Sequence, residues 1–378
     1  MNWRRIIMAI CMLPVLGGCE IEPRLHLRKA VETKVILQTS VTADIMWQVD
    51  WQARWQYAWQ PELHGQVGYS EPKTMRLHIY TQGTDGTPKT HNTFNFHGMN
   101  GQVEIFEGIH NLLFHNTDSE VLSFRSDDEA WTVEATTRII SRGLKPSSPV
   151  RTLEQKKAST KADMDEIDEP VAFMPDELFS LYDPDRLITD NLDDYEYIDG
   201  KYVLRIHGDL HPASIIYLFQ IKLLNNLGRV TGSEGGAVLT GVSRSVDLKT
   251  GMTSTEKVGV PADVHLNKTA DPDMFGCRVL CFGIPGCNPY DDASVAAAPG
   301  GRHWFVMNIC FQTGKYKNIR IDVTDKIRAL PLGGVIDLEI DVEDFPPEEV
   351  DPPIQDGGGF LPLIGNWQEE VGETTINY

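Results

Sequence analysis

Basic residues are scarce in this chain relative to acidic ones. Only 34 lysines and arginines stand against 54 aspartates and glutamates, a formal net charge of −20 over 378 residues. So acidic a chain is repelled by nucleic acid and by anionic lipid, which argues against both as partners. Apolar residues are not scarce, because hydrophobic types make up 41% and aromatics 9%. The chain can therefore bury a core and is not broadly disordered.

A long apolar run is also missing from the start of the chain. The stretch from Ile6 to Leu16 is about eleven residues and contains Pro14, too short for a membrane-spanning helix. It follows Arg4 and Arg5 and ends in Gly17-Gly18-Cys19, the order of a secretory signal peptide with a lipoprotein cleavage site. We expect cleavage before Cys19, lipid on its sulfur and attachment to the membrane through that lipid. An ordinary secretory signal and an uncleaved anchor are the alternatives.

Catalytic signatures are lacking as well. The chain contains no G-x-S-x-G, H-E-x-x-H, phosphate loop or G-x-G-x-x-G. His207 and His211 are spaced like a zinc pair, but Pro212 follows and the segment is not helical. Asp183-x-Asp185 opens like a calcium loop and then has Ile188 where the sharp turn requires glycine. We therefore predict no catalytic residue, no metal site and no cofactor.

Cysteine is rare, and its placement is informative. Of six cysteines, Cys11 lies in the leader and Cys19 would carry lipid. An even number then remains in an exported chain, which favours two disulfides, although the sequence does not select a pairing. A zinc site at Cys277-x3-Cys281 and free thiols are the alternatives. Nearby glycines and prolines predict that the cluster is a loop. The candidates are Cys277, Cys281, Cys287 and Cys310.

A row of tryptophans stands out near the N-terminus. Its spacing of four suggests a helix, but the remaining odd positions are also apolar and nearly all even positions are polar. That period of two predicts a strand with one apolar face. The face either packs inward on a second sheet or forms an aromatic platform for a sugar or peptide. The row consists of Trp47, Trp51, Trp55 and Trp59.

Short alternating runs separated by turn residues recur along the rest of the chain and predict an all-β fold of two sandwiches. We expect a short helical turn at 175–179 and a loop at 183–199. The expected organisation is a signal peptide (1–18), a lipidated tether (19–33), an N-terminal sandwich (34–144), a linker (145–170), a C-terminal sandwich (171–344) and an acidic tail rich in proline and glycine (345–378). Among the expected strands are 34–41, 75–80, 102–106, 110–115, 202–207, 215–223, 304–311 and 335–342.

Several segments carry a resemblance to a known family. They are LGGC at 16–19, EPRLHLRKA at 22–30, MRLHIYTQGTDG at 75–86, IFEGIHNLLFHNTDSEVLSF at 105–124, FMPDELF at 173–179, similar to an interdomain segment, and the strand, turn and strand at 217–251. With them the chain resembles the fimbrillin-like lipoproteins of Bacteroidales. The resemblance implies two tandem transthyretin-like (Greek-key) β-sandwiches, an outer-membrane location and a role in adhesion or fimbria assembly. It also implies, as partners, either fimbrial subunits, which in such systems complete a neighbour's sheet with a donated strand, or a ligand on a host or bacterial surface. The family pattern accounts for neither the cysteine cluster nor the tail.

Three functions remain open at this point. The first is a non-enzymatic adhesion or fimbrial accessory lipoprotein, favoured by the lipoprotein signal and the β-only pattern. The second is a glycan-binding surface lipoprotein, which requires the tryptophan row to face solvent. The third is a hydrolase whose carboxylates the sequence does not single out.

Overall fold

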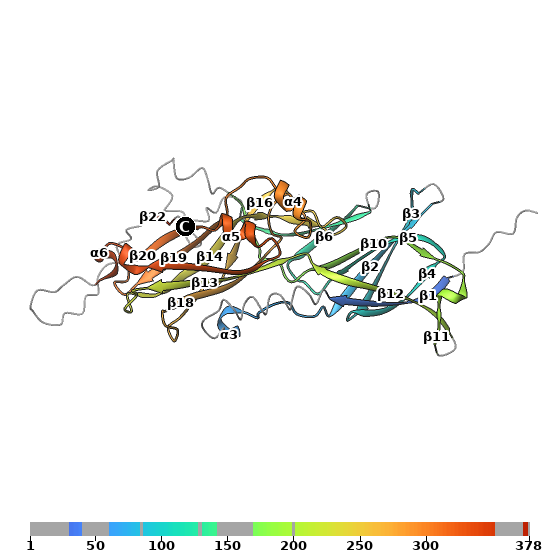
Figure 1. The fold of residues 1–378 in the computed structure, drawn as a ribbon, viewed down its shortest axis with the longest axis horizontal. Helices are drawn as coiled ribbons and strands as arrows, with labels where there is room; N and C mark the ends of the chain where they lie inside the picture. The colour runs from blue at the N-terminus through green and yellow to red at the C-terminus, as the bar shows by residue number, and fades with distance from the viewer. Residues whose placement is uncertain are drawn as a thin grey trace, which may run out of the picture.

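A computed structural model describes residues 30–39, 60–83, 86–127, 131–141, 169–198, 201–351 and 373–376. Figure 1 shows an elongated molecule with β1 (Ala30–Thr39) toward one end and β22 (Glu373–Ile376) toward the other. Strands dominate the described chain, and many of them run broadly along the long axis. The fold is all-β, as the alternating sequence pattern predicts.

The first group of strands, which we call the N-terminal β-body, forms a sheet in the order β3-β2-β5-β10-β12-β1-β4, with β11 paired to β12. β10 and β12 pair only at two positions, Phe179–Pro212 and Ser180–His211, and beyond them the sheet divides around a core. Side chains from both halves meet there, including Leu77 and Ile206. The strands are β2 (Thr74–Gln82), β3 (Pro88–His97), β4 (Asn100–Phe106), β5 (Gly108–Asn116), β10 (Phe179–Ile188), β11 (Glu196–Ile198) and β12 (Lys201–Pro212).

A small sheet covers the other face of β2 and β5. Its order is β15 (Ser245–Asp247), β7 (Thr132–Thr137) and β6 (Leu122–Asp127). Tyr80 and Leu113 are buried against it, although both belong to strands whose opposite face already lines a core. Two faces of β2 are therefore buried, which explains why the strand alternates between aliphatic residues and the polar aromatics His78 and Tyr80.

The second group, the C-terminal β-body, is a sandwich of two sheets. One sheet has the order β17-β18-β13-β21 and the other β22-β20-β19-β14-β16-β9-β8. Aliphatic and aromatic side chains fill the space between them, and the rings of Phe219 and Phe305 stack with centroids 4.2 Å apart. The strands are β8 (Ile139–Ser141), β9 (Val171–Ala172), β13 (Ile215–Leu224), β14 (Val230–Ser243), β16 (Lys257–Ala262), β17 (His265–Asn267), β18 (Met274–Cys281), β19 (Trp304–Phe311), β20 (Tyr316–Asp322) and β21 (Gly334–Asp341).

The described helices are short and lie at connections. They are α3 (Pro61–His64), η2 (Leu192–Asp194), α4 (Asp292–Ala297), α5 (Thr324–Ala329), η3 (Val342–Asp344) and α6 (Pro347–Val350). Residues in the described ranges form no helix with the length and apolar character needed to cross a bilayer.

Most expected strands are present, and three local expectations are wrong. Residues 175–178 are not helical but extend into β10, which also occupies part of the expected loop at 183–199. The cysteine cluster is not wholly a loop either, because Cys277 and Cys281 lie within β18. In both segments the inter-strand ladder outweighs the local glycine, proline and acidic signals.

The sheets also divide the chain differently from the expected boundaries. β10 and β12 follow residue 171, yet they complete the N-terminal sheet. The expected tail begins too early, because Phe345 and Val350 are buried in the C-terminal core and the Phe345 ring contacts that of Phe311 at 5.3 Å. Burial of these two side chains holds the chain to the sandwich as far as α6.

Candidate functional site

At the junction between the two β-bodies, buried and partly buried polar contacts join segments that are far apart in the sequence. The helix α3 lies beside β18, and its last residue, His64, has Nδ1 3.1 Å from the carbonyl oxygen of Gly276. A Cβ at position 276 would lie 2.8 Å from the His64 ring, so this close approach requires glycine. Burial is the main cause that lowers the pKa of His64, which keeps the ring neutral at the joint.

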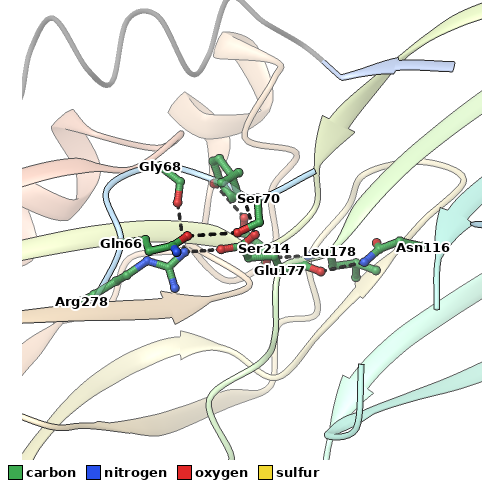
Figure 2. A network of polar contacts seen from close by, with 9 residues as sticks. Gln66, Gly68, Ser70, Asn116, Glu177, Leu178, Ser214 and Arg278 are labelled. Atoms are coloured by element: carbon green, nitrogen blue, oxygen red, sulfur yellow. Dashed lines mark hydrogen bonds and ion pairs between the residues drawn. The ribbon is translucent and has the colours of Figure 1, made fainter. Parts of the chain in front are cut away.

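An ion pair between Arg278 and Glu177 forms the centre of the junction (Figure 2). Arg278 Nη2 donates to Glu177 Oε1 at 2.5 Å and to the carbonyl oxygen of Gly68 at 3.1 Å. The second carboxylate oxygen accepts from the Ser70 amide at 2.6 Å. Because the two side chains are only 16% and 19% exposed, each charge depends on the other for stabilisation.

The side chain of Asn116 continues this network into the N-terminal β-body (Figure 2). Its Nδ2 donates to the carbonyl oxygen of Glu177 at 2.9 Å, and its Oδ1 accepts from the Phe179 amide at 2.8 Å. Ser214, at the start of the C-terminal β-body, accepts from the Leu178 amide through Oγ at 2.9 Å. Segment 177–179 is therefore hydrogen-bonded to both β-bodies, and the network fixes how they meet.

A hollow of about 520 Å³ opens beside this network. We call it the acidic hollow, because five of the residues around it are carboxylates and only Lys73 and Arg278 are cationic. Several of the carboxylates are already engaged: Asp176 accepts from Ser119 Oγ at 2.7 Å, and Asp118 from the Lys73 amide at 3.0 Å. In the described part of the chain, no group of three or more His, Cys, Asp or Glu side chains could hold a metal ion. The acidic lining is Glu71, Asp118, Glu120, Asp176 and Glu177.

A second polar cluster, the histidine row, lies under the small sheet. It consists of His91 on β3, His78 on β2 and His115 on β5, whose rings stack at 5.1 and 5.2 Å between neighbours. His115 Nδ1 is 2.9 Å from the Asn116 carbonyl and must donate, so its Nε2 accepts from His78 Nε2 at 3.1 Å. His78 Nδ1 then accepts from His91 Nε2 at 2.9 Å. Each of the two buried rings is thereby assigned one tautomer.

The buried histidines are neutral near pH 7. Burial, with smaller contributions from His115, His91 and Arg76, lowers the pKa of His78 to about 3. Burial also lowers the pKa of His115 to about 4, against the opposing effect of the bond to the Asn116 carbonyl. His78 and His115 are therefore hydrogen-bonded to each other as uncharged rings, an arrangement that an added proton would disrupt.

The four cysteines are free thiols, so the predicted disulfides are not present in the structure. Cys277 and Cys281 lie four residues apart on β18, a separation of about 13 Å that a disulfide does not span. Cys310 lies on β19 in the opposite sheet, and Cys287 Sγ is 3.4 Å from the Ile284 carbonyl oxygen. Cys281 is a fully buried core side chain, and burial raises the pKa of its thiol to about 12. A thiol with so high a pKa is a poor zinc ligand.

The other sequence candidates have mixed outcomes. Cys19 and the tryptophan row (Trp47, Trp51, Trp55 and Trp59) lie outside the described residues, and so do residues 1–18. Asp183 is on β10 and pairs with Arg186 at 2.6 Å rather than opening a calcium loop. Sequence reasoning missed the role of Arg278 and Asn116, because a single polar residue in an apolar strand shows its partner only after folding. The FMPDELF segment was the one available signal, and it does lie at the junction.

Comparison with known proteins gives one family and a set of remote structures. The profile of a family described as a domain of unknown function (DUF5119) matches residues 64–263. A search of curated proteins found no match. Similar solved structures include a candidate adhesin from Bacteroides ovatus, 16% identical over 87% of this chain and 95% of that one, with a TM-score of 0.45. Others are the fimbrial anchor protein Mfa2 from Porphyromonas gingivalis (10%, 83% and 91%, 0.39) and a candidate polysaccharide-binding protein from Bacteroides thetaiotaomicron (4%, 82% and 91%, 0.40).

Proposed function

This chain belongs to the DUF5119 family, whose profile covers more than half of it, and from that premise we propose a non-enzymatic outer-membrane lipoprotein of the cell surface. Its role would be adhesion or service as a fimbrial anchor or accessory subunit. The structural neighbours bear the names of Bacteroidales adhesins and fimbrial proteins, but their likeness to this chain is too low to carry the proposal.

One observation carries it: the outer edge of β20 is completed by a strand from the far end of the chain. β22 pairs with β20 in parallel, with Asn318 opposite Glu373 and Ile321 opposite Ile376. β22 occupies this edge as an added strand does in β-augmentation, so without β22 the edge of β20 would present unpaired amide and carbonyl groups to another strand. Subunits that assemble by strand addition need such an edge.

The position of the N-terminal strand supports a membrane tether at the opposite end. β1 starts at Ala30, which pairs with Phe106 at the end of β4. Ten residues lie between Cys19 and Ala30, and the eleven Cα-to-Cα steps can span at most about 40 Å. A lipid on Cys19 would hold the N-terminal β-body near the membrane and direct the β20 edge outward.

Fatty-acid labelling in cells tests the lipid part of this proposal. The native chain should incorporate label, whereas Cys19→Ser should not and should be released from the membrane fraction. Cys310→Ser is the matched control and should label as the native chain does. Equal labelling of native chain and Cys19→Ser would contradict the proposal.

A truncated chain tests the assembly part. A chain ending at residue 372 should bind a peptide of residues 373–378 in trans, and the same peptide with Thr375→Pro should bind more weakly because it lacks one ladder donor. Binding of both peptides with equal affinity, or of neither, would count against an accepting edge at β20.

A glycan-binding surface lipoprotein is the second candidate function. The observation that favours it is a hollow of about 280 Å³ beside the start of β10 and the end of β12, lined in part by the aromatic side chains of Tyr182, His211 and Tyr290.

A further inference from the structure

The sheet that contains β19 and β20 has a buried apolar patch on the side away from the C-terminal core, which we call the outer face. Phe305 and Met307 of β19 point into the core, so the alternating residues Trp304 and Val306 lie on the opposite side. These two form a cluster of their own, to which none of the other described sheets contributes. Even so, Trp304 is only 4% exposed and Val306 0%. Burial this deep on an unpartnered sheet face requires an occupant.

Two buried polar groups on the outer face are donors that lack an acceptor within the described part of the chain. Arg320, on β20 opposite Val306, is 7% exposed, and its Nε has no hydrogen-bond partner there. The indole Nε1 of Trp304 has none either. The guanidinium carbons of Arg320 and Arg302 lie 5.2 and 5.6 Å from the centroid of the Trp304 ring. A suitable occupant therefore brings apolar side chains, hydrogen-bond acceptors and negative charge.

Residues 352–372 have that composition. They contain three carboxylates and no lysine or arginine, together with Trp367 and the apolar run FLPLI at 360–364. Residues 142–168, which join β8 to β9 of the same sheet, instead carry six basic side chains against five acidic ones and no comparable apolar run. Charge and apolar content both favour the first segment. Its acidic residues are Asp356, Glu369 and Glu370.

Both ends of this segment lie beside β20. Just before it, the Glu349 carbonyl oxygen accepts from Thr313 Oγ1 at 2.7 Å, at the turn between β19 and β20. Just after it, Glu373 lies opposite Asn318 on β20. Along β19, Trp304 is about 25 Å from that turn, and a loop of 21 residues that runs out and back can reach about 35 Å. The segment is therefore long enough to reach the whole outer face.

We propose that residues 352–372 dock on the outer face of their own chain. The apolar run at 360–364 packs on Trp304, and carboxylates of the segment face Arg320. β22 then anchors the far end of the docked segment as well as completing the edge of β20. The inference goes beyond the proposed surface role, and it requires neither lipid on Cys19 nor a strand from another subunit.

Hydroxyl-radical footprinting of the full chain, with oxidised residues located by mass spectrometry, tests this inference. Trp304 should be protected in the native chain. Leu361→Asp combined with Leu363→Asp should raise its oxidation rate about fivefold or more, because the indole becomes accessible. Phe305 is fully buried on the core side of the same strand and should stay unmodified in both chains, which separates loss of docking from unfolding.

A charge-reversed variant tests the electrostatic part without altering the apolar run. Glu369→Lys combined with Glu370→Lys should raise the oxidation rate of Trp304 about twofold or more, because lysines would face Arg320. Gln355→Asp combined with Asn366→Asp is the matched control. It adds the same charge as the leucine variant at polar positions and should leave Trp304 protected.

Several outcomes would overturn the proposal. A Trp304 that is already reactive in the native chain would do so, as would full protection in both the leucine variant and the charge-reversed variant. Exposure of Trp304 by Leu153→Asp would assign the outer face to residues 142–168 instead. Protection that disappears on dilution of the native chain would assign it to a second copy. None of these results bears on the Cys19 labelling experiment, so the two proposals fail independently.

Discussion

The C-terminal core and the histidine row are both enclosed between packed sheets, yet their contents differ. Apolar side chains fill the C-terminal core, and the thiols among them have raised pKa values. The histidine row instead places ring nitrogens between the small sheet and β2, and each nitrogen of the two buried rings is hydrogen-bonded. Shape complementarity stabilises the first region, whereas the second also depends on a fixed protonation state. The two regions should therefore respond to different perturbations.

Truncation of a core ring should give the largest effect. Phe219→Ala removes a fully buried side chain stacked on Phe305, and we expect a loss of about 4 kcal/mol in the free energy of unfolding. Urea denaturation measures it. Leu227→Ala, whose side chain is 84% exposed, is the control and should stay within about 0.5 kcal/mol of the native chain. A small effect at Phe219 would mean that the sheets are not packed as described.

The ion pair that joins the two β-bodies should rank next. Glu177→Ala removes the carboxylate that accepts from Arg278 and from the Ser70 amide. We expect the free energy of unfolding to fall by about 3 kcal/mol. Glu177→Gln keeps an acceptor and should recover part of that loss.

Glu196→Ala is the surface control for the junction. Its exposed pair with Arg205 should contribute less than about 1 kcal/mol. Equal effects at Glu177 and Glu196, again by urea denaturation, would show that the junction pair is effectively solvated.

Lowering the pH should destabilise the fold mainly through the buried histidines of the row. The folded pKa values of His78 and His115 are about 3 and 4, below the value of about 6.5 in an unfolded chain. The folded state therefore binds fewer protons, and the stabilising contribution is complete above pH 6.5 and is lost as pH falls toward 4. As pH falls from 7.5 to 5.0, each of these two histidines should lower the free energy of unfolding by about 2 kcal/mol.

Replacing a single histidine isolates that effect. His115→Phe removes one titrating ring beside Phe124, so its stability should fall less steeply with acid than that of the native chain. His303→Gln is the comparison outside the row and should reduce the acid dependence by a similar amount, because burial also lowers the pKa of His303 to about 4. A pH dependence of stability that His115→Phe leaves unchanged would contradict the neutral state assigned to His115.

The thiols should give the smallest effect. Cys277→Ala removes a small buried group and should cost about 1 kcal/mol. In the native chain, alkylation at neutral pH should modify the partly exposed Cys310 before Cys277 or Cys281, because burial raises the pKa of both core thiols. Resistance of all four to alkylation even after unfolding would restore the disulfide interpretation.

Period-two alternation predicted the strands well, because one buried face leaves a direct signal in the sequence. Residues 75–80 and 304–311 illustrate it. The sequence pattern did not predict β3, because its sequence, PKTHNTFNFH, contains few apolar residues. β3 is the edge strand that pairs with β2. β18 was masked by glycine and proline in the loop that follows it. Pairing partners, not local propensity, decide such segments.

The sites were far less predictable than the strands. Arg278 and Glu177 lie about a hundred residues apart, and nothing near either one marks the other as its partner. Tyr290 and Lys249 came from loops with no periodic pattern, so only folding brings them to one hollow. The expected thiol pairing failed for a similar reason, because an even count of cysteines fixes no distance between them.

The placement of β1 and β22 at opposite ends has a mechanical consequence. A force applied between β1 and the β20 edge would load the molecule along its length. Parallel ladders such as β1–β12 and β20–β22 then bear the load across many hydrogen bonds at once, in shear rather than one bond at a time.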